Sequence, residues 1–146
     1  MITSNIKQTM REWKKTTDSL DAHAIAARDE MMKELIGLSK KEIKGERYYF
    51  PSKSGKTRYY AKATPGEPPM NRTGNLRRSI TGVKGKEGFG TYTAIVGPGM
   101  KYARHLELGG PKWKEGVKFP FMEPAWRKFQ SIGMEIIKKH FNLGRI

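Results

Sequence analysis

The chain has 146 residues, a length that predicts one domain over residues 1–146. It contains no cysteine, which excludes disulfide bonds and cysteine-ligated metals, and we expect no membrane helix because no apolar run approaches about 20 residues. Residues 1–39 carry six basic and six acidic side chains, so the net charge of +15 lies entirely in residues 40–146. That part of the chain should attract polyanions or acidic proteins.

The first 40 residues predict one long helix. From Asn5 to about Ser39, apolar side chains recur every three or four residues and form one stripe: Ile6, Met10, Trp13, Thr17, Leu20, Ala24, Ala27, Met31, Leu35 and Leu38. Such a helix would be about 50 Å long, and Asp18 is a candidate cap that would divide it into two. Two interpretations stay open: the whole stripe packs on the protein's own sheet, or part of it contacts another protein.

Residues 45–63 predict a basic, aromatic β-hairpin. Arg47–Phe50 and Thr57–Lys62 favour strands, and the intervening Ser52–Lys56 favours a turn. Aromatic rings beside basic groups can stack on bases and neutralise phosphates. The candidate nucleic-acid contacts are Arg47, Tyr49, Lys53, Lys56, Arg58 and Tyr60. The alternative is that the aromatic rings face the core and the lysines face solvent.

The same segment contains the end of a phosphate-binding motif, Ser54-Gly55-Lys56-Thr57. Phe50 stands where the full motif needs its first glycine, and the following segment favours a strand rather than a helix. We therefore expect no nucleotide site there.

Residues 64–122 predict the sheet core. Three prolines within residues 64–69 indicate a loop, after which Ser79–Lys84 and Thr91–Gly97 favour a second antiparallel hairpin. Tyr102–Leu108 has the spacing of a two-turn helix with Tyr102, Ala103 and Leu106 inward, and Gly109 ends it. With the first hairpin, these strands should form a four- to five-stranded antiparallel sheet.

Residues 123–141 predict the C-terminal helix. Pro124 suits a first helical turn. The expected buried face consists of Ala125, Phe129, Ile132, Ile136, Ile137 and Phe141. Together with the long N-terminal helix and the sheet, this element places the chain in the α+β class.

No pattern in the sequence is typical of a catalytic, cofactor-binding or metal site. His23, His105 and His140 are scattered, and the last aspartate is Asp29, so no carboxylate cluster for a metal pair is present. We interpret Glu107 as an ion-pair partner for a nearby arginine, with Arg77 or Arg78 as candidates. We therefore expect a protein that is not an enzyme.

Three short signatures occur in order: Arg72–Ser79, Tyr102–Gly109 and Pro120–Ala125. In this order they resemble the neck or tail-completion proteins (head–tail connector, minor tail) of long-tailed bacteriophages. The family often has Thr where this chain has Gly110, and its connection before the first signature is usually shorter than residues 47–62. The residues that carry the resemblance are Arg72, Thr73, Gly74, Leu76, Arg77, Ser79, Tyr102, Ala103, Glu107, Gly109, Pro120, Phe121 and Pro124.

The resemblance implies a structural virion protein that forms a ring of six or twelve subunits in the head–tail joint. Its neighbours would be the head-closure and tail-terminator proteins, it would need no cofactor, and it would reside in the host cytoplasm during assembly. The basic excess would face either DNA in the channel or acidic neighbouring rings. The alternative function is a small basic nucleic-acid-binding protein that uses the hairpin at residues 47–62.

Overall fold

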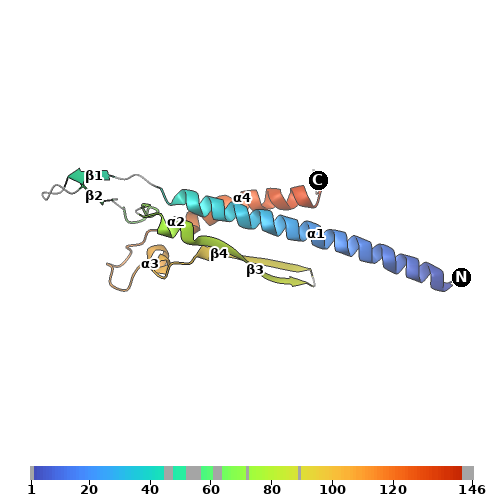
Figure 1. Ribbon diagram of the computed structural model, residues 1–146. Coiled ribbons are helices and arrows are strands. Elements are labelled where there is room, and N and C mark those ends of the chain that lie inside the picture. Colours follow the sequence, from blue (N-terminus) through green and yellow to red (C-terminus); the bar gives the residue numbers. More distant parts are fainter. Residues whose placement is uncertain are drawn as a thin grey trace.

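The structure is a computed structural model that describes residues 2–44, 48–51, 57–60, 64–71, 73–88 and 90–142. It has the α+β composition that we expected, with a long N-terminal helix and a C-terminal helix. Figure 1 shows α4 and the β3–β4 hairpin lying beside the C-terminal half of α1. In chain order, the elements are α1 (Ile2–Glu42), β1 (Tyr48–Pro51), β2 (Thr57–Tyr60), α2 (Asn75–Ser79), β3 (Ile80–Gly88), β4 (Thr91–Pro98), α3 (Ala103–Leu108) and α4 (Met122–His140).

Helix α1 is continuous over 41 residues, about 60 Å at 1.5 Å per residue. The division at Asp18 does not occur. The hydroxyls of Thr16 and Thr17 donate to the carbonyls of Glu12 and Trp13 at 3.0 Å, so they bond within the helix instead of interrupting it. None of the helices in the described part of the chain is long and apolar enough to cross a membrane.

The expectation of one four- or five-stranded sheet is wrong. The strands of the described residues form two separate two-stranded antiparallel sheets, one of β1 and β2 and the other of β3 and β4. After β2 the chain passes through residues 64–71, where three prolines cannot donate ladder hydrogen bonds. Helix α1 packs against both β3 and β4, so a helix covers the second hairpin instead of further strands.

Two apolar clusters hold the elements together. One joins Ile43, just after α1, to Leu76 of α2, Ile80 of β3, Ala103 of α3 and Phe121, just before α4. The other joins α1 to α4 through Leu38, Ala125 and Phe129. The predicted buried face of α4 is confirmed at Ala125, Phe129 and Ile136, while Ile132, Ile137 and Phe141 are half-buried.

The hairpin lies close on α1 because Gly82 has no side chain. A Cβ at this position would lie 2.6 Å from the Cγ and Sδ of Met32 and 3.1 Å from the Cδ1 of Ile36. These distances are below van der Waals contact, so a larger residue would push β3 away from the helix.

Ion pairs fix the hairpin and α4 on α1. The guanidinium of Arg28, almost fully buried, bonds Glu87 at 2.5 Å and Asp29 at 2.8 Å, and Lys84 bonds Asp29 at 2.7 Å. Lys84 and then Arg28 lower the pKa of the Asp29 carboxyl. Lys139 and His140 of α4 bond Glu30 at 2.9 and 2.7 Å and lower the pKa of its carboxyl.

A further contact links the tip of the hairpin to α1. The phenol of Tyr92 hydrogen-bonds Asp21, and this bond, together with desolvation, raises the Tyr92 pKa to about 12. Polar contacts thus secure the part of α1 near the hairpin, from Asp21 to Glu30.

Candidate interaction surface

Glu107 caps the N-terminus of α4. Its carboxylate accepts backbone hydrogen bonds from Phe121 at 2.8 Å, Met122 at 3.0 Å and Glu123 at 2.9 Å. The first N–H groups of a helix have no acceptor within it, and a negative charge there complements the helix dipole. Among the described residues the Glu107 carboxylate is bonded to these three donors, and its expected pairing with Arg77 or Arg78 stays a prediction.

A signal for this role was present in the sequence. The residue at the N-cap position of α4 is Phe121, whose side chain cannot accept a hydrogen bond. The free N–H groups of that helix therefore required an acceptor from elsewhere. Sequence spacing alone could not identify Glu107, because it lies 14 residues before Phe121.

The second and third signatures form one unit through further contacts. The Phe119 N–H donates to the Leu106 carbonyl at 2.7 Å, and the side chains of Ala103 and Phe121 share the first apolar cluster. Gly109 has φ +96°, and a Cβ there would lie 3.2 Å from the Val117 carbonyl oxygen. Pro120 is buried and Pro124 is half-buried, so this part of the signatures builds the fold.

Tyr102 does not face inward as predicted. Its side chain is 45% exposed, whereas Ala103 is buried and Leu106 is half-buried. The helix starts after Tyr102, and this position, at the helix N-cap, turns the ring outward.

The first signature forms a tight turn into α2. Gly74 has φ +78°, a left-handed conformation that glycine adopts readily, and the Thr73 hydroxyl accepts weakly from the Asn75 N–H at 3.4 Å. Leu76 and Ile80 are buried. The Ser79 hydroxyl donates to the Leu76 carbonyl at 2.8 Å.

Arg78 folds back on this turn instead of pointing to a neighbour. Its guanidinium donates to the Asn75 side chain at 2.7 Å and to the Thr73 carbonyl at 3.2 Å. Arg77 is exposed, and Arg72 lies outside the described residues.

The candidate nucleic-acid contacts are not tested by the structure. Arg47, Lys53 and Lys56 lie outside the described residues. Tyr49, Arg58 and Tyr60 belong to the pairing of β1 with β2, where Tyr49 is opposite Tyr59 and Phe50 is opposite Arg58. Within the described residues, no group of three or more His, Asp or Glu side chains could hold a metal ion.

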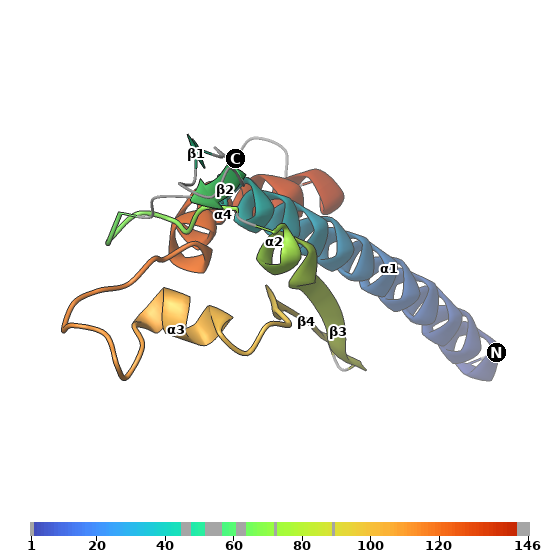
Figure 2. The ribbon, with the colours of Figure 1, turned by 60° about the vertical axis from the view of Figure 1, so that its left-hand side comes forward.

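Within the described residues, the N-terminal half of the α1 stripe is an extended row of exposed apolar side chains. Ile6, Met10, Trp13 and Leu20 are 53%, 67%, 75% and 51% exposed, although they lie in line with the buried Ala27 and Leu38. Figures 1 and 2 show this half of the helix projecting past α4 and past the hairpin. Large apolar side chains aligned on an exposed surface are typical of a protein interface.

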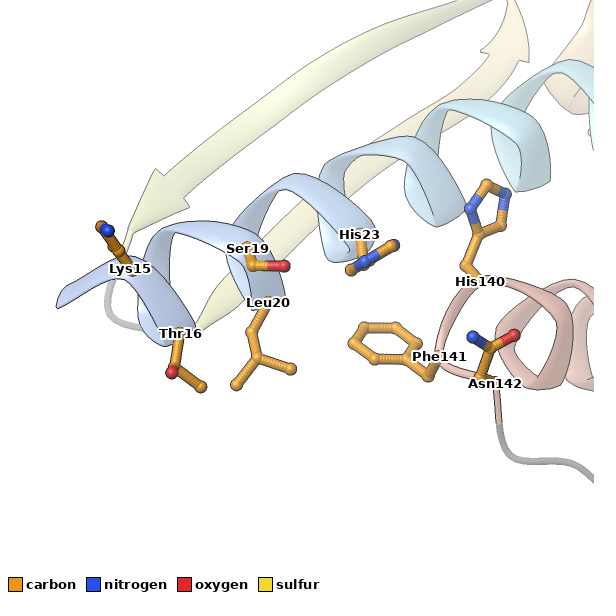
Figure 3. A pocket seen from close by; sticks show the side chains of 8 residues that line it. All are labelled: Lys15, Thr16, Ser19, Leu20, His23, His140, Phe141 and Asn142. Carbon is orange, nitrogen blue, oxygen red and sulfur yellow. The ribbon is translucent and has the colours of Figure 1, made fainter. Parts of the chain in front are cut away.

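A groove marks the point at which the intramolecular packing of α1 stops. It has a volume of about 440 Å³, lies between α1 and the end of α4, and has Leu20, His23 and Phe141 in its lining. The rings of His23 and Phe141 lie 6.3 Å apart (Figure 3). The exposed stripe therefore continues directly into this groove.

Comparison with protein families shows which family the chain belongs to. Residues 8–109 match the family described as "Bacteriophage HK97-gp10, putative tail-component". The chain belongs to this family. The family match confirms the resemblance found from the three signatures. The protein is a structural tail component of a bacteriophage. No curated protein and no solved structure matches the chain.

The family match covers most of α1 and all of the first two signatures. The matched region therefore includes the exposed stripe from Met10 to Leu20 as well as the α3 segment that caps α4. Membership makes the protein a component of the virion.

Proposed function

We propose that this tail component forms a ring in the head–tail joint and is needed for tail completion or for attachment of the tail to the head. The observation that carries the proposal is the exposed stripe of α1. A tail component acts by docking, and this stripe is the extended apolar surface that the fold itself leaves open.

The energetics of the stripe favour docking. Burying a large apolar side chain is worth about 1.5–3 kcal/mol, so Ile6, Met10, Trp13 and Leu20 together offer a substantial gain to a partner. A helical segment without tertiary packing is only marginally stable in water. A partner on the stripe would therefore also stabilise the projecting half of the helix.

A ring requires two different surfaces on each subunit, because cyclic contacts beyond a dimer are heterologous. In the proposed joint, six or twelve subunits surround the channel, with the head-closure and tail-terminator proteins on either side. The basic excess of residues 40–146 would meet DNA in the channel or acidic surfaces of the neighbouring rings. Assembly would take place in the host cytoplasm before the protein becomes part of the virion.

Electron microscopy of a phage with a nonsense mutation in this gene tests the proposal. We expect filled heads beside unattached tails, or particles with defective tails. Complementation with the wild-type gene should restore joined particles. Normal infectious particles from the mutant would contradict the proposal, because the joint would then form without this protein.

A further inference from the structure

The β3–β4 hairpin has an unusual distribution of side chains. Two of its three charged residues, Lys84 and Glu87, bind Asp29 and Arg28 of α1, and the third, Lys86, is exposed. Two of its apolar residues, Val83 and Ile95, turn outward, where they are 64% and 71% exposed, while Ile80 is buried and Val96 packs against the first apolar cluster. An antiparallel hairpin packed on one side normally has its apolar residues inward and its charged residues outward.

The two outward residues form a single apolar spot. Val83 and Ile95 are direct cross-strand partners in the register of β3 and β4. Thr81 and Thr93, on the same side, are also exposed. We call these four side chains the outer face of the hairpin; none of them is charged.

Charge favours a second copy of this chain as the occupant of the outer face. Two molecules of net charge +15 repel each other unless neutral surfaces meet. The outer-face side chains are neutral, and residues 1–39, which contain the exposed stripe, sum to zero charge. An acidic partner would gain more by binding the basic remainder of the chain.

Geometry requires the stripe to come from a neighbour. The C-terminal half of α1 lies on the inner side of the hairpin, where Met32 and Ile36 meet Gly82. Because α1 is continuous, its own N-terminal half cannot turn round to the outer face (Figures 1 and 2).

The exposed stripe also agrees in length with the hairpin that carries the outer face. Ile6 to Leu20 spans about 21 Å of helix, and β4, from its first to its last residue, spans about 24 Å of strand. A neighbour's helix could therefore cover most of the hairpin.

We propose that the exposed stripe of α1 in one subunit packs on the outer face of the β3–β4 hairpin of the next subunit. The hairpin then lies between two helices, its own α1 inside and the neighbour's α1 outside. The contact is heterologous and repeats from subunit to subunit, as a ring needs. This inference rests on the proposed ring and specifies the surfaces that close it.

The absence of cysteine from the chain allows a direct test by disulfide cross-linking. One chain carries Trp13→Cys and a second carries Ile95→Cys, and the mixture is oxidised at increasing protein concentration. We expect the mixed 13–95 dimer to form roughly tenfold or more faster than the control, because docking raises the effective concentration of the two thiols. A chain with both substitutions should yield a ladder of oligomers.

The matched control replaces Trp13→Cys by Trp126→Cys. Trp126 is also a half-exposed tryptophan, at 50%, but it lies on α4. A second acceptor, Val83→Cys, should cross-link to position 13 as Ile95→Cys does, and circular dichroism checks that each variant is folded.

Three results would overturn the inference. The first is cross-linking between positions 13 and 95 that is no faster than cross-linking between positions 126 and 95. A chain that stays monomeric at every concentration would give this result. The second is a dominant 13–13 product, which would indicate symmetric pairing of helices. The third is failure of Val83→Cys to cross-link while Ile95→Cys does. None of these alters the microscopy of the nonsense mutant, so failure of the interface and failure of the proposed function are distinguishable.

Discussion

Glu107 connects two parts of the chain that are separated in sequence. Its carboxylate binds three consecutive backbone N–H groups at the start of α4, so it fixes both the position of that helix and the path of the loop before it. The Phe119 N–H, which bonds the Leu106 carbonyl, closes the same loop. A residue that looks like a surface acid in the sequence therefore stabilises the junction of α3 with α4.

We predict that Glu107→Ala lowers the free energy of unfolding by about 1–3 kcal/mol, because it removes a charged acceptor from several helix N-terminal donors. Glu107→Gln keeps one acceptor oxygen and should lose less. Urea unfolding followed by circular dichroism measures both. Glu115→Ala, an exposed residue in the loop after α3, removes the same charge and serves as the control. Equal midpoints for the two alanine variants would show that the cap is not stabilising.

At the scale of elements, β3 packs closely on α1 because a glycine on the strand faces large side chains on the helix. Gly82 leaves room for Met32 and Ile36, and the ion pairs of Arg28 and Lys84 lie further along the same contact. This contact and the α1–α4 packing support the C-terminal half of α1, whereas the N-terminal half projects beyond them (Figure 2).

We predict that Gly82→Val lowers the free energy of unfolding by about 1–3 kcal/mol, since the added methyl groups overlap Met32 and force the hairpin off the helix. Gly97→Val is the control, because a Cβ at Gly97 of β4 meets no atom within 4 Å. Thermal unfolding should separate the two variants. A Gly97→Val protein as unstable as Gly82→Val would mean that strand glycines, not the helix contact, determine the loss.

At the scale of the whole molecule, stability and assembly lie in different parts of the protein. The apolar clusters and ion pairs lie around the C-terminal half of α1, and the exposed stripe occupies the other half. A neutral, apolar projection on a strongly basic body suits a subunit that contacts copies of itself at one surface and other partners elsewhere.

This separation predicts that Trp13→Ser leaves the free energy of unfolding within about 0.5 kcal/mol of wild type but fails to restore infectious particles to the nonsense mutant. Trp13 is 75% exposed, so its loss opens no cavity in the core. Trp126→Ser, on α4, should complement normally. Full complementation by Trp13→Ser would show that the stripe is not part of the assembly interface.

The sequence by itself determined the two long helices, the short helix α3, the two hairpins and the family. Local periodicity, turn residues and short signatures are encoded by neighbouring residues, so α1, β3–β4, α3 and α4 were predictable from Asn5 to Phe141. Only the tertiary structure decided how those elements meet. The hairpins stay separate because α1 covers one of them, Glu107 caps a helix that begins 15 residues later, and half of a uniform stripe is left exposed because α4 and the hairpin end before it. Periodicity reports which face of a helix is apolar, but the packing partner of that face depends on residues far away in the chain.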